Sequence, residues 1–378
     1  MPIVHAVVEC SVPASFRVRQ VRGMFDLSED AGRKSEFEVE LPGIEEGWSI
    51  GLIVGPSGSG KTTVARAAFG GYFADACSWP LGQSILDAFP ARMGIGEITG
   101  LLSSVGFSSP PAWVRGFESL SNGEQFRVNL ARALAELPEL AVVDEFTSLV
   151  DRTVARIGSA ALAKAVRQSG RRFVAVTCHN DVADWLEADW ILDMSDGSLS
   201  RASLPGQGQA RGLRRPAIRL EIIRCGASAW NLFKRHHYLS ERLHPSAQCF
   251  MGLIEDRPAA FVAALPFPHA QRPGWREHRC VCLPDFQGLG IGSAVSEFVA
   301  ALFAATGKPY TSVTSHPAMI WHRARRGAIW RMTRAPSHAS PGRKMRRTQS
   351  SRRMTASFRY VGPPRREEAR AFAVGGVD

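Results

Sequence analysis

Residues 55–62, with the sequence GPSGSGKT, combine three glycines with a lysine and a threonine. They match the pattern G-x-x-x-x-G-K-[ST], in which glycines let backbone N–H groups approach phosphate oxygens. Lys61 would reach the β- and γ-phosphates of a nucleoside triphosphate, and the Thr62 hydroxyl would ligate Mg²⁺. This stretch therefore predicts an ATP phosphate site. Its candidate binding residues are Gly55, Ser57, Gly58, Gly60, Lys61, Thr62 and Thr63.

Two adjacent carboxylates, Asp144 and Glu145, follow the apolar run LAVV at residues 140–143. Asp144 would hold Mg²⁺, and Glu145 is placed to activate the attacking water as a general base. Such a pair is common by chance when it stands alone. Because it follows a phosphate-binding pattern, it predicts ATP hydrolysis.

The phosphate-binding residues and the two carboxylates can act together only if the fold brings them to one edge of a sheet. Residues 48–55 are typical of a buried strand that enters a glycine-rich turn, and residues 62–69 are typical of a helix. Further apolar runs at 140–143 and 173–177 fit parallel strands buried on both faces. Strands that alternate with helices predict an α/β layer fold.

Residues 120–125 (LSNGEQ) resemble the LSGGQ signature of ATP-binding cassette (ABC) proteins. The sequence departs from the commonest form, with Asn122 in place of glycine and Glu124 ahead of Gln125. Residues 148–151 (SLVD) are similar to the D-loop of that family, and residues 177–179 (TCH) to its switch histidine. Together with the two motifs above, the resemblance covers about residues 15–195.

This resemblance implies a head-to-tail homodimer that closes around ATP. Ser121 and Gly123 of one protomer would contact the γ-phosphate held by the other protomer. His179 would sense the γ-phosphate, and Asp151 would couple the two sites. A buried structural role for His179 is the alternative.

Two further positions of the ABC family are less clearly marked. Phe25 is either the aromatic residue that stacks on adenine or an ordinary core residue. Gln83 is either the glutamine of the Q-loop or a polar loop residue, because it follows Lys61 unusually soon. The short interval implies a trimmed antiparallel subdomain, which disfavours a transporter subunit.

Composition separates the two halves of the 378-residue chain, which is long enough for two domains. Residues 1–200 contain 17 Lys and Arg against 25 Asp and Glu, whereas the remainder carries a net charge of +19. This asymmetry predicts that the second half meets a polyanion, of which DNA or RNA is the commonest, or is simply a soluble basic surface.

The sequence contains neither an apolar run of membrane-spanning length nor a signal peptide, so a cytoplasmic protein without a membrane partner is expected. The seven scattered cysteines are expected to be reduced.

Residues 281–292 (VCLPDFQGLGIG) resemble the Q/R-x-x-G-x-G/A motif of GNAT acetyltransferases. The resemblance implies that a loop after a splayed strand binds the diphosphate of acetyl-CoA or another acyl-CoA, since glycines expose N–H groups beside a helix N-terminus. A simple strand-to-helix turn is the alternative. The candidate residues are Gln287, Gly288, Gly290 and Gly292. The order of predicted elements also resembles GNAT: strand 220–223, helix 227–238, hairpin 249–254 and 259–265, strand 279–283 and helix 293–305.

The catalytic tyrosine that GNAT enzymes often carry on the last helix is absent from residues 318–327. His322 could substitute for it or be an exposed helix residue. A second group, His236, His237 and Tyr238, lies in the segment that usually forms the acceptor side of a GNAT site, and histidine titrates near neutral pH. With His244 and Cys249 this group could also bind a metal, although standard ligand spacing is missing. Each could equally be structural.

The predicted fold class is α/β, a P-loop ABC-type nucleotide-binding domain followed by an α+β GNAT acyltransferase-like domain. The expected boundaries are 1–200 for the ATPase domain, 201–217 for a linker and 218–364 for the GNAT-like domain, with residues 331–354 as a mobile basic arm. The architecture is similar to phage Mom-type and tRNA cytidine acetyltransferase systems. The leading hypothesis is an ATPase coupled to acylation of a nucleic-acid base. The alternative is an ATP-gated nucleic-acid binding or regulatory protein with an inactive GNAT-like domain.

Overall fold

The structure, a computed structural model, describes residues 3–10, 15–25, 33–74, 79–201, 218–238, 241–268, 271, 273–338 and 354–375. The chain forms two compact units. The first contains residues 1–78, 132–151 and 162–216, and the second contains residues 79–131, 152–161 and 217–378. The predicted linker at 201–217 lies outside the described residues except for Arg201. The predicted domain boundaries stay predictions.

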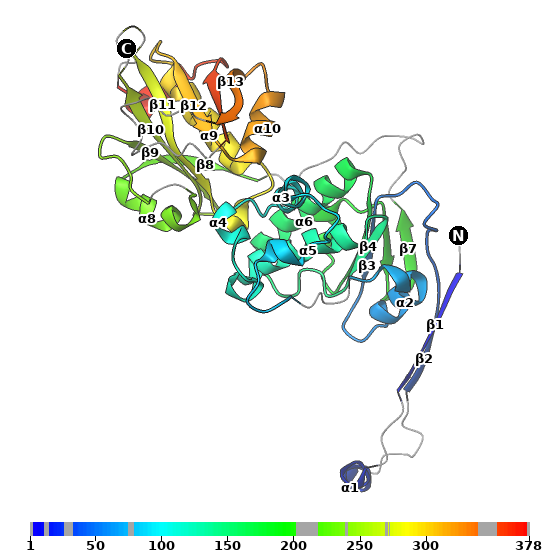
Figure 1. The fold of residues 1–378 in the computed structure, drawn as a ribbon. Helices are drawn as coiled ribbons and strands as arrows, with labels where there is room; N and C mark the ends of the chain where they lie inside the picture. The colour runs from blue at the N-terminus through cyan, green and yellow to red at the C-terminus, as the bar shows by residue number, and fades with distance from the viewer. Residues whose placement is uncertain are drawn as a thin grey trace. The chain divides into compact units, whose positions relative to one another are not determined.

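The first unit contains a five-stranded sheet in the order β4-β5-β3-β6-β7. Strands β3 (Ile50–Val54), β4 (Leu140–Val143), β5 (Arg172–Thr177) and β6 (Trp190–Asp193) are parallel, and β7 (Ser198–Arg201) is antiparallel to β6. Helix α2 (Lys61–Phe69) follows β3, and α7 (Val182–Leu186) follows β5. Every residue of β3 is buried, which explains its continuous apolar sequence. The α/β layer arrangement predicted for this region is confirmed (Figure 1).

The N-terminal residues of the first unit form a hairpin of β1 (Ile3–Cys10) and β2 (Arg33–Glu40), with α1 (Phe16–Phe25) between them in sequence. The β2 residue Phe37 and the buried Val39 join the apolar core around β3 and α2.

The second unit begins with a helical segment. It contains α3 (Ile95–Ser104), the short α4 (Pro110–Trp113), and the first residues of α5 (Asn122–Glu136) and α6 (Arg152–Ser169). Short 3₁₀ turns lie at Ile85–Ala88 and Phe117–Ser119. The signature residues therefore lie at the start of α5.

The remainder of the second unit is built on a seven-stranded sheet in the order β13-β14-β12-β11-β10-β9-β8. Its elements are β8 (Glu221–Cys225), α8 (Trp230–Phe233), β9 (Gln248–Ile254), β10 (Arg257–Phe267), β11 (Gly274–Cys282), α9 (Ile291–Ala304), β12 (Tyr310–Thr314), α10 (Pro317–Arg325), β13 (Trp330–His338), β14 (Met354–Tyr360) and α11 (Arg366–Ala371).

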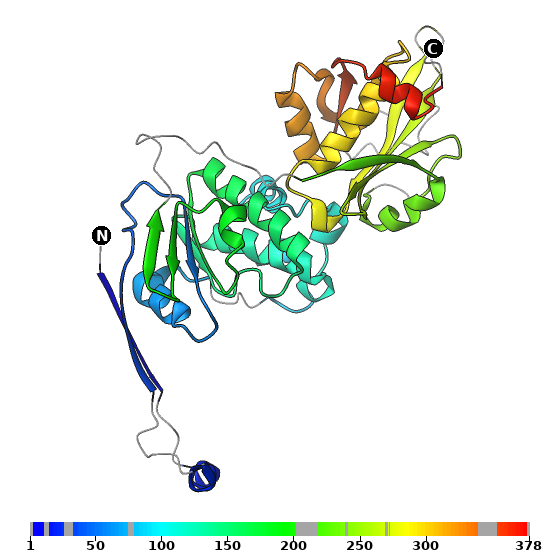
Figure 2. The same ribbon diagram turned by 180° about the vertical axis from the view of Figure 1, so that it is seen from behind.

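Both faces of this sheet are covered. Figure 2 shows α9, α10 and α11 on one face, in yellow, orange and red, whereas α8 lies on the other. Strand β10 alternates accordingly, because Val262 packs with Val295 of α9 and Phe261 packs with Trp230 of α8. The parallel strands β11 and β12 pair only at Trp275↔Tyr310 and Arg276↔Thr311. Beyond these two positions they splay apart, as the GNAT resemblance implies.

Two predictions of secondary structure were wrong. The segment 227–238 is not one helix but a 3₁₀ turn (Ala227–Ala229), the single-turn α8 and a second 3₁₀ turn (Lys234–His236). One turn suffices because it already buries Trp230 and Phe233 against the sheet. Residues 331–338 are not a mobile arm, since they form edge strand β13 paired with β14. Their polar sequence fits an edge strand with exposed side chains. Residues 339–353 of the predicted arm lie outside the described residues.

Among the helices that the structure describes, none is long and apolar enough to cross a bilayer.

Candidate functional site

Three neighbouring parallel strands of the first unit bring the predicted nucleotide residues to one edge of the sheet. In the register of β3, β5 and β4, Val54 lies opposite Thr177 and Val143 lies opposite Ala175. The loop 55–60, the pair Asp144-Glu145 and residues 178–179 therefore all follow the carboxyl ends of adjacent strands. In open α/β sheets this edge is where ligands bind.

The phosphate-binding loop depends on glycine at defined points. Gly58 and Gly60 have φ angles of 78° and 85°, which disfavour residues with a Cβ atom. A Cβ on Gly60 would also lie 2.5 Å from the Phe37 ring. Helix α2 starts directly after Gly60, so the free N–H groups of its first turn face the loop. The Lys61 ammonium donates to the Pro56 carbonyl at 2.6 Å, which keeps its charge over the loop.

The turn after β4 holds the two carboxylates in a strained conformation. Glu145 and Thr147 have φ angles of 49° and 70°, in the left-handed region that costs free energy for such residues. The Glu145 N–H donates to Asp144 Oδ1 at 2.8 Å, and the Ser148 hydroxyl donates to Glu145 Oε2 at 2.7 Å. Ser148 therefore orients the predicted general base. The sequence marked it only as a D-loop residue.

The switch position follows β5. The His179 N–H donates to Thr177 Oγ1 at 3.2 Å, which fixes the turn, and the residue is half-buried. Asp151 of the D-loop is exposed. Thr62 at the start of α2 and Asp144 after β4 carry oxygen atoms of the kind that Mg²⁺ prefers, and their role as its ligands stays a prediction. Within the described ranges, no group of three or more His, Cys, Asp or Glu side chains could hold a metal ion. Thr62 and Asp144 are only two ligands, so they would hold Mg²⁺ together with the phosphate oxygens of a bound nucleotide.

The signature residues form a capping box at the N-terminus of α5. The Ser121 N–H and hydroxyl donate to Glu124 Oε2 at 3.0 and 3.1 Å, and the Glu124 N–H lies 3.4 Å from Ser121 Oγ. The departure from the commonest signature at Glu124 therefore has a structural reason. Gly123 is buried, and a Cβ there would lie 2.9 Å from Asp285 Oδ1.

The glycine-rich loop of the second unit leads from β11 into α9. Gly288 and Gly290 have φ angles of 97° and 82°, and Gly290 is the exposed N-cap of α9. Gln287 is buried, with its Nε2 donating to the Cys282 carbonyl at 2.8 Å and its Oε1 accepting from the Ser108 N–H at 2.5 Å. Gly290 is the exposed residue of this loop, so its backbone is accessible to a ligand.

Comparison with known proteins finds similarity for the GNAT-like segment and for the ATP-binding half of the chain. Residues 216–327 match the model of the Acetyltransferase (GNAT) family. The chain is 32% identical over 190 residues to the "Fe(3+) ions import ATP-binding protein FbpC" of Pseudomonas fluorescens (strain Pf0-1), covering 41% of this chain and 54% of that protein. It is 33% identical over 168 residues to the "Aliphatic sulfonates import ATP-binding protein SsuB 2" of Frankia alni, covering 39% and 66%.

The chain combines an ABC ATPase domain with a GNAT domain. It spans about half the length of the first curated relatives that it matches. The solved dimeric structure of the ATP-binding cassette MJ0796 in a post-hydrolysis state, bound to ADP and phosphate, is 17% identical, with a TM-score of 0.39 over 53% of this chain and 98% of that one.

One of the predicted acyl-transfer residues, Tyr238, contacts the backbone that follows β12. The Ser315 N–H, directly after β12, donates to the Tyr238 hydroxyl oxygen at 3.4 Å. Tyr238 therefore lies beside the carboxyl end of β12, on the side of the sheet where β11 and β12 no longer pair.

The neighbouring histidines serve other contacts. His237 is buried edge-on against Trp230 and stacks on Tyr238 at 5.0 Å between ring centroids. His236 accepts from Arg235 Nε at 3.0 Å, and burial, followed by the charge of Arg235, lowers its pKa. The structure does not place either ring as a freely accessible base. Both assignments stay predictions.

The metal alternative for the same segment gains no support. His244 lies beside His278, whose ring accepts from the His244 N–H at 3.3 Å. Burial, and then the charges of Arg279 and Arg276, lower the pKa of His278 to about 4. Cys249 is buried on β9, where it packs with the α8 core.

The GNAT helix α10 is fixed by a buried ion pair. Arg323 donates to both carboxylate oxygens of Glu277 at 3.0 and 3.1 Å, to Ser296 and to Ser312, and its guanidinium lies 4.2 Å from the Trp330 ring centroid. This cluster ties α10 to β11, α9 and β12. His322 on the same helix instead faces Glu297 at 3.4 Å. Its predicted catalytic role therefore competes with an ion pair.

Two predicted nucleotide-binding residues remain, Phe25 in the first unit and Gln83 in the second unit. Phe25 ends α1 with 69% of its surface exposed, which excludes the alternative of an ordinary core residue in this structure. Gln83 lies in an exposed turn of the second unit. Nothing in the structure tests their contact with a nucleotide.

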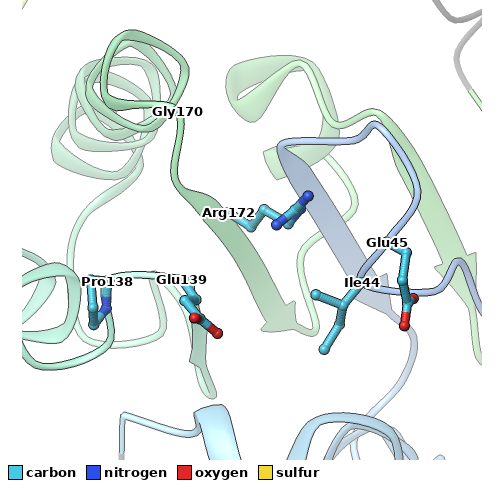
Figure 3. A pocket seen from close by; sticks show the side chains of 6 residues that line it. All are labelled: Ile44, Glu45, Pro138, Glu139, Gly170 and Arg172. Carbon is cyan, nitrogen blue, oxygen red and sulfur yellow. The ribbon is translucent and has the colours of Figure 1, made fainter.

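A surface hollow of the ABC domain lies at the opposite edge of the sheet from the phosphate-binding loop. Figure 3 shows its lining side chains, which precede β3, β4 and β5: Ile44, Glu45, Pro138, Glu139, Gly170 and Arg172. Since these residues stand at the amino ends of the strands, the hollow is separate from the nucleotide site.

Proposed function

We propose that this protein is an ATPase that works as a head-to-tail homodimer in the cytoplasm and couples ATP hydrolysis to acyl transfer from acyl-CoA to a nucleic-acid base. The observation that carries the proposal is the presence of two glycine-rich loops in one chain, each of which follows a strand and leads directly into a helix. One has the residues of an ATP site, and the other has those of an acyl-CoA site.

The ATPase half rests on the edge formed by β3, β4 and β5. Lys61 and the N-terminus of α2 would bind the phosphates, and Mg²⁺ held through Thr62 and Asp144 would neutralise their charge. Glu145, oriented by Ser148, accepts a proton from the water whose oxygen attacks the γ-phosphorus, and the bond from that phosphorus to the β,γ-bridging oxygen breaks. Ser121 and Gly123 would complete the site of the second copy, with Asp151 and His179 linking the two.

The acyl-transfer half rests on the splayed cleft. The base amine attacks the thioester carbonyl, the carbon–sulfur bond breaks, and the amide bond forms. Tyr238 gives its hydroxyl proton to the departing CoA thiolate, and the proton of the amine passes to water. The N–H groups between Gly288 and Gly292, with the N-terminus of α9, would hold the CoA diphosphate.

A nucleic-acid acceptor is supported by charge on the β13–β14 edge. Arg331 and Arg359 lie directly opposite each other on these strands, an arrangement that is unfavourable unless an anion lies nearby. Both side chains are exposed. On α10, the exposed Trp321 carries the Arg325 guanidinium 3.6 Å from its ring centroid, and such pairs can stack on bases.

Replacing Arg331 with glutamine is expected to weaken DNA or RNA binding and to reduce the slope of log K against log salt by about 1, and the double variant Arg331→Gln/Arg359→Gln by about 2. Fluorescence anisotropy with a labelled oligonucleotide at several salt concentrations measures this. Arg219→Gln is the matched control, because Arg219 is exposed beside β8 at the other edge of the sheet. An unchanged slope in the double variant would remove this edge from the binding surface.

The function as a whole is tested by incubating the protein with acetyl-CoA, ATP, Mg²⁺ and nucleic acid, and analysing the nucleosides by mass spectrometry. Acyl-nucleosides that require both ATP and acetyl-CoA are the expected result. Transfer to protein lysines alone would contradict the nucleic-acid acceptor.

The second candidate function is an ATP-gated nucleic-acid binding protein with an inactive GNAT domain. We call residues 287–292 the acyl-CoA loop. The burial of Gln287 favours this second candidate, because the first side chain of the acyl-CoA loop already accepts a hydrogen bond from the Ser108 N–H. Calorimetric titration with CoA separates the two candidates, since the inactive form is expected to bind none.

A further inference from the structure

A buried arginine joins the helix of the ABC signature to the acyl-CoA loop within the second unit. Arg127 lies one helical turn after Gly123 on α5 and is fully buried. One of its terminal nitrogens donates to the carbonyls of Gly106 and Gln287 at 3.1 and 3.0 Å, and the other donates to the Asp285 carbonyl at 2.7 Å. Two of these three acceptors belong to the loop that follows β11.

The chain packs closely around this arginine. A Cβ on Gly288 would lie 2.9 Å from Gly106 Cα, and a Cβ on Gly106 would lie 2.3 Å from the Arg127 guanidinium and 2.7 Å from the Gln287 carbonyl oxygen. Such spacing allows only glycine at both positions. A displacement of α5 is therefore transmitted to the loop, because no free space absorbs it.

The helical segment that contains Gly106 also contacts the residue that leads from β12 into α10. His316, directly before α10, places its Nε2 2.8 Å from the Ser108 carbonyl oxygen, and its ring lies near Trp113. Ser108 thus contacts Gln287 after β11 through its N–H and His316 after β12 through its carbonyl. Ser108, between α3 and α4, therefore contacts the segments that follow both splayed strands.

Keeping a guanidinium in this place costs free energy. Burial lowers the pKa of Arg127 to about 10, although the Asp285 charge opposes that shift. Its acceptors are backbone carbonyls, so the planar fork fixes the path of the chain at three points. Apolar side chains would fill this volume at lower electrostatic cost. The arginine is thus better explained by positioning than by stability.

We propose that Arg127 is a positioning residue that couples the acyl-CoA loop to the ABC signature, so that ATP engagement at Ser121 and Gly123 changes the affinity for acyl-CoA. This inference rests on the proposed function, which places ATP at the signature and acyl-CoA at the loop. Coupling of this kind is reciprocal, since acyl-CoA must change the affinity for ATP by the same factor.

The test is a set of calorimetric titrations on the full chain carrying Glu145→Gln, which prevents turnover. Acetyl-CoA is titrated with and without saturating ATP and Mg²⁺, and ATP with and without acetyl-CoA. We expect each ligand to change the Kd of the other by about fivefold or more, and by equal factors. In the Arg127→Met variant both factors are expected to fall to about 1, with each ligand still binding alone.

Arg132→Met is the matched control, because Arg132 lies on the same helix and pairs with Glu136 at 2.7 Å. It is expected to retain the coupling factor of the parent. Arg127→Lys keeps the charge but lacks the planar fork, so it is expected to lose most of the coupling even where Arg127→Met folds poorly. Circular dichroism and ATP binding alone report whether each variant is folded.

The outcomes separate the inference from the proposed function. If the parent binds no acetyl-CoA with or without ATP, acyl transfer itself fails. If it binds both ligands with a coupling factor of about 1, or if the folded Arg127→Met and Arg127→Lys variants keep the factor of the parent, the coupling role of Arg127 is overturned and the proposed function stands.

Discussion

Replacing Glu145 with glutamine is expected to lower ATP turnover by about 10²- to 10⁴-fold, the usual contribution of a positioned general base. The amide of glutamine retains the size of the side chain and can still accept from the Ser148 hydroxyl. It cannot take a proton from water. ATP binding is expected to remain, because the phosphate contacts come from the loop and Lys61. Phosphate release measures turnover, and calorimetry with ATP measures binding.

Two further variants make this prediction specific. Lys61→Ala is expected to lose ATP binding as well as turnover, since the ammonium lies over the phosphate-binding loop. Ser148→Ala is expected to lower turnover by about tenfold, roughly the value of one lost hydrogen bond to a charged group. Turnover that continues unchanged in Glu145→Gln would show that another group activates the water.

The nucleotide edge of the first unit could be predicted from sequence because its signals are local. Each motif follows an apolar run, and parallel strands place such run ends side by side whatever the rest of the chain does. The strands expected at residues 140–143 and 173–177 form β4 and β5 with nearly the same bounds. The need for glycine in the phosphate-binding loop could also be predicted, because the positive φ of Gly60 belongs to the motif itself.

The contacts that orient the site could not be predicted in this way. Arg127 and Gln287 are 160 residues apart in sequence, and an arginine in the middle of an amphipathic helix gives no sign that it is buried. Ser148 and Glu124 belong to recognised motifs, yet their bonds to Glu145 and Ser121 depend on turn geometry. The pattern S-x-x-E at Ser121 was the one available signal, since it is typical of a capping box.

Both misassigned elements were decided by tertiary contacts that the local sequence does not show. The segment 227–238 has helical spacing of its aromatic residues, but a single turn buries Trp230 and Phe233 and the chain then turns away. The basic segment after Trp330 has the composition of a solvated arm, but hydrogen bonding to β14 makes its first part a strand. The polar composition correctly predicted that the side chains of this segment are exposed. It gave no indication that the backbone pairs with β14.

Replacing Tyr238 with phenylalanine is expected to lower the rate constant of acyl transfer by about 10²-fold or more, with little change in the KM for acetyl-CoA. The ring would still stack on His237. Only the hydroxyl is lost, and its proton is the one that the departing thiolate needs. The hydroxyl oxygen already accepts from the Ser315 N–H, which orients the O–H bond away from that backbone group. Release of free CoA in the presence of the nucleic-acid acceptor measures the rate.

His322→Ala is the informative comparison, because His322 was the alternative proton donor predicted from the last helix. Since its ring faces Glu297, its removal is expected to leave the rate within about twofold, and to affect folding by no more than about 1 kcal/mol, as for other partly exposed pairs. The opposite pattern, with Tyr238→Phe active and His322→Ala inactive, would move the general acid to α10.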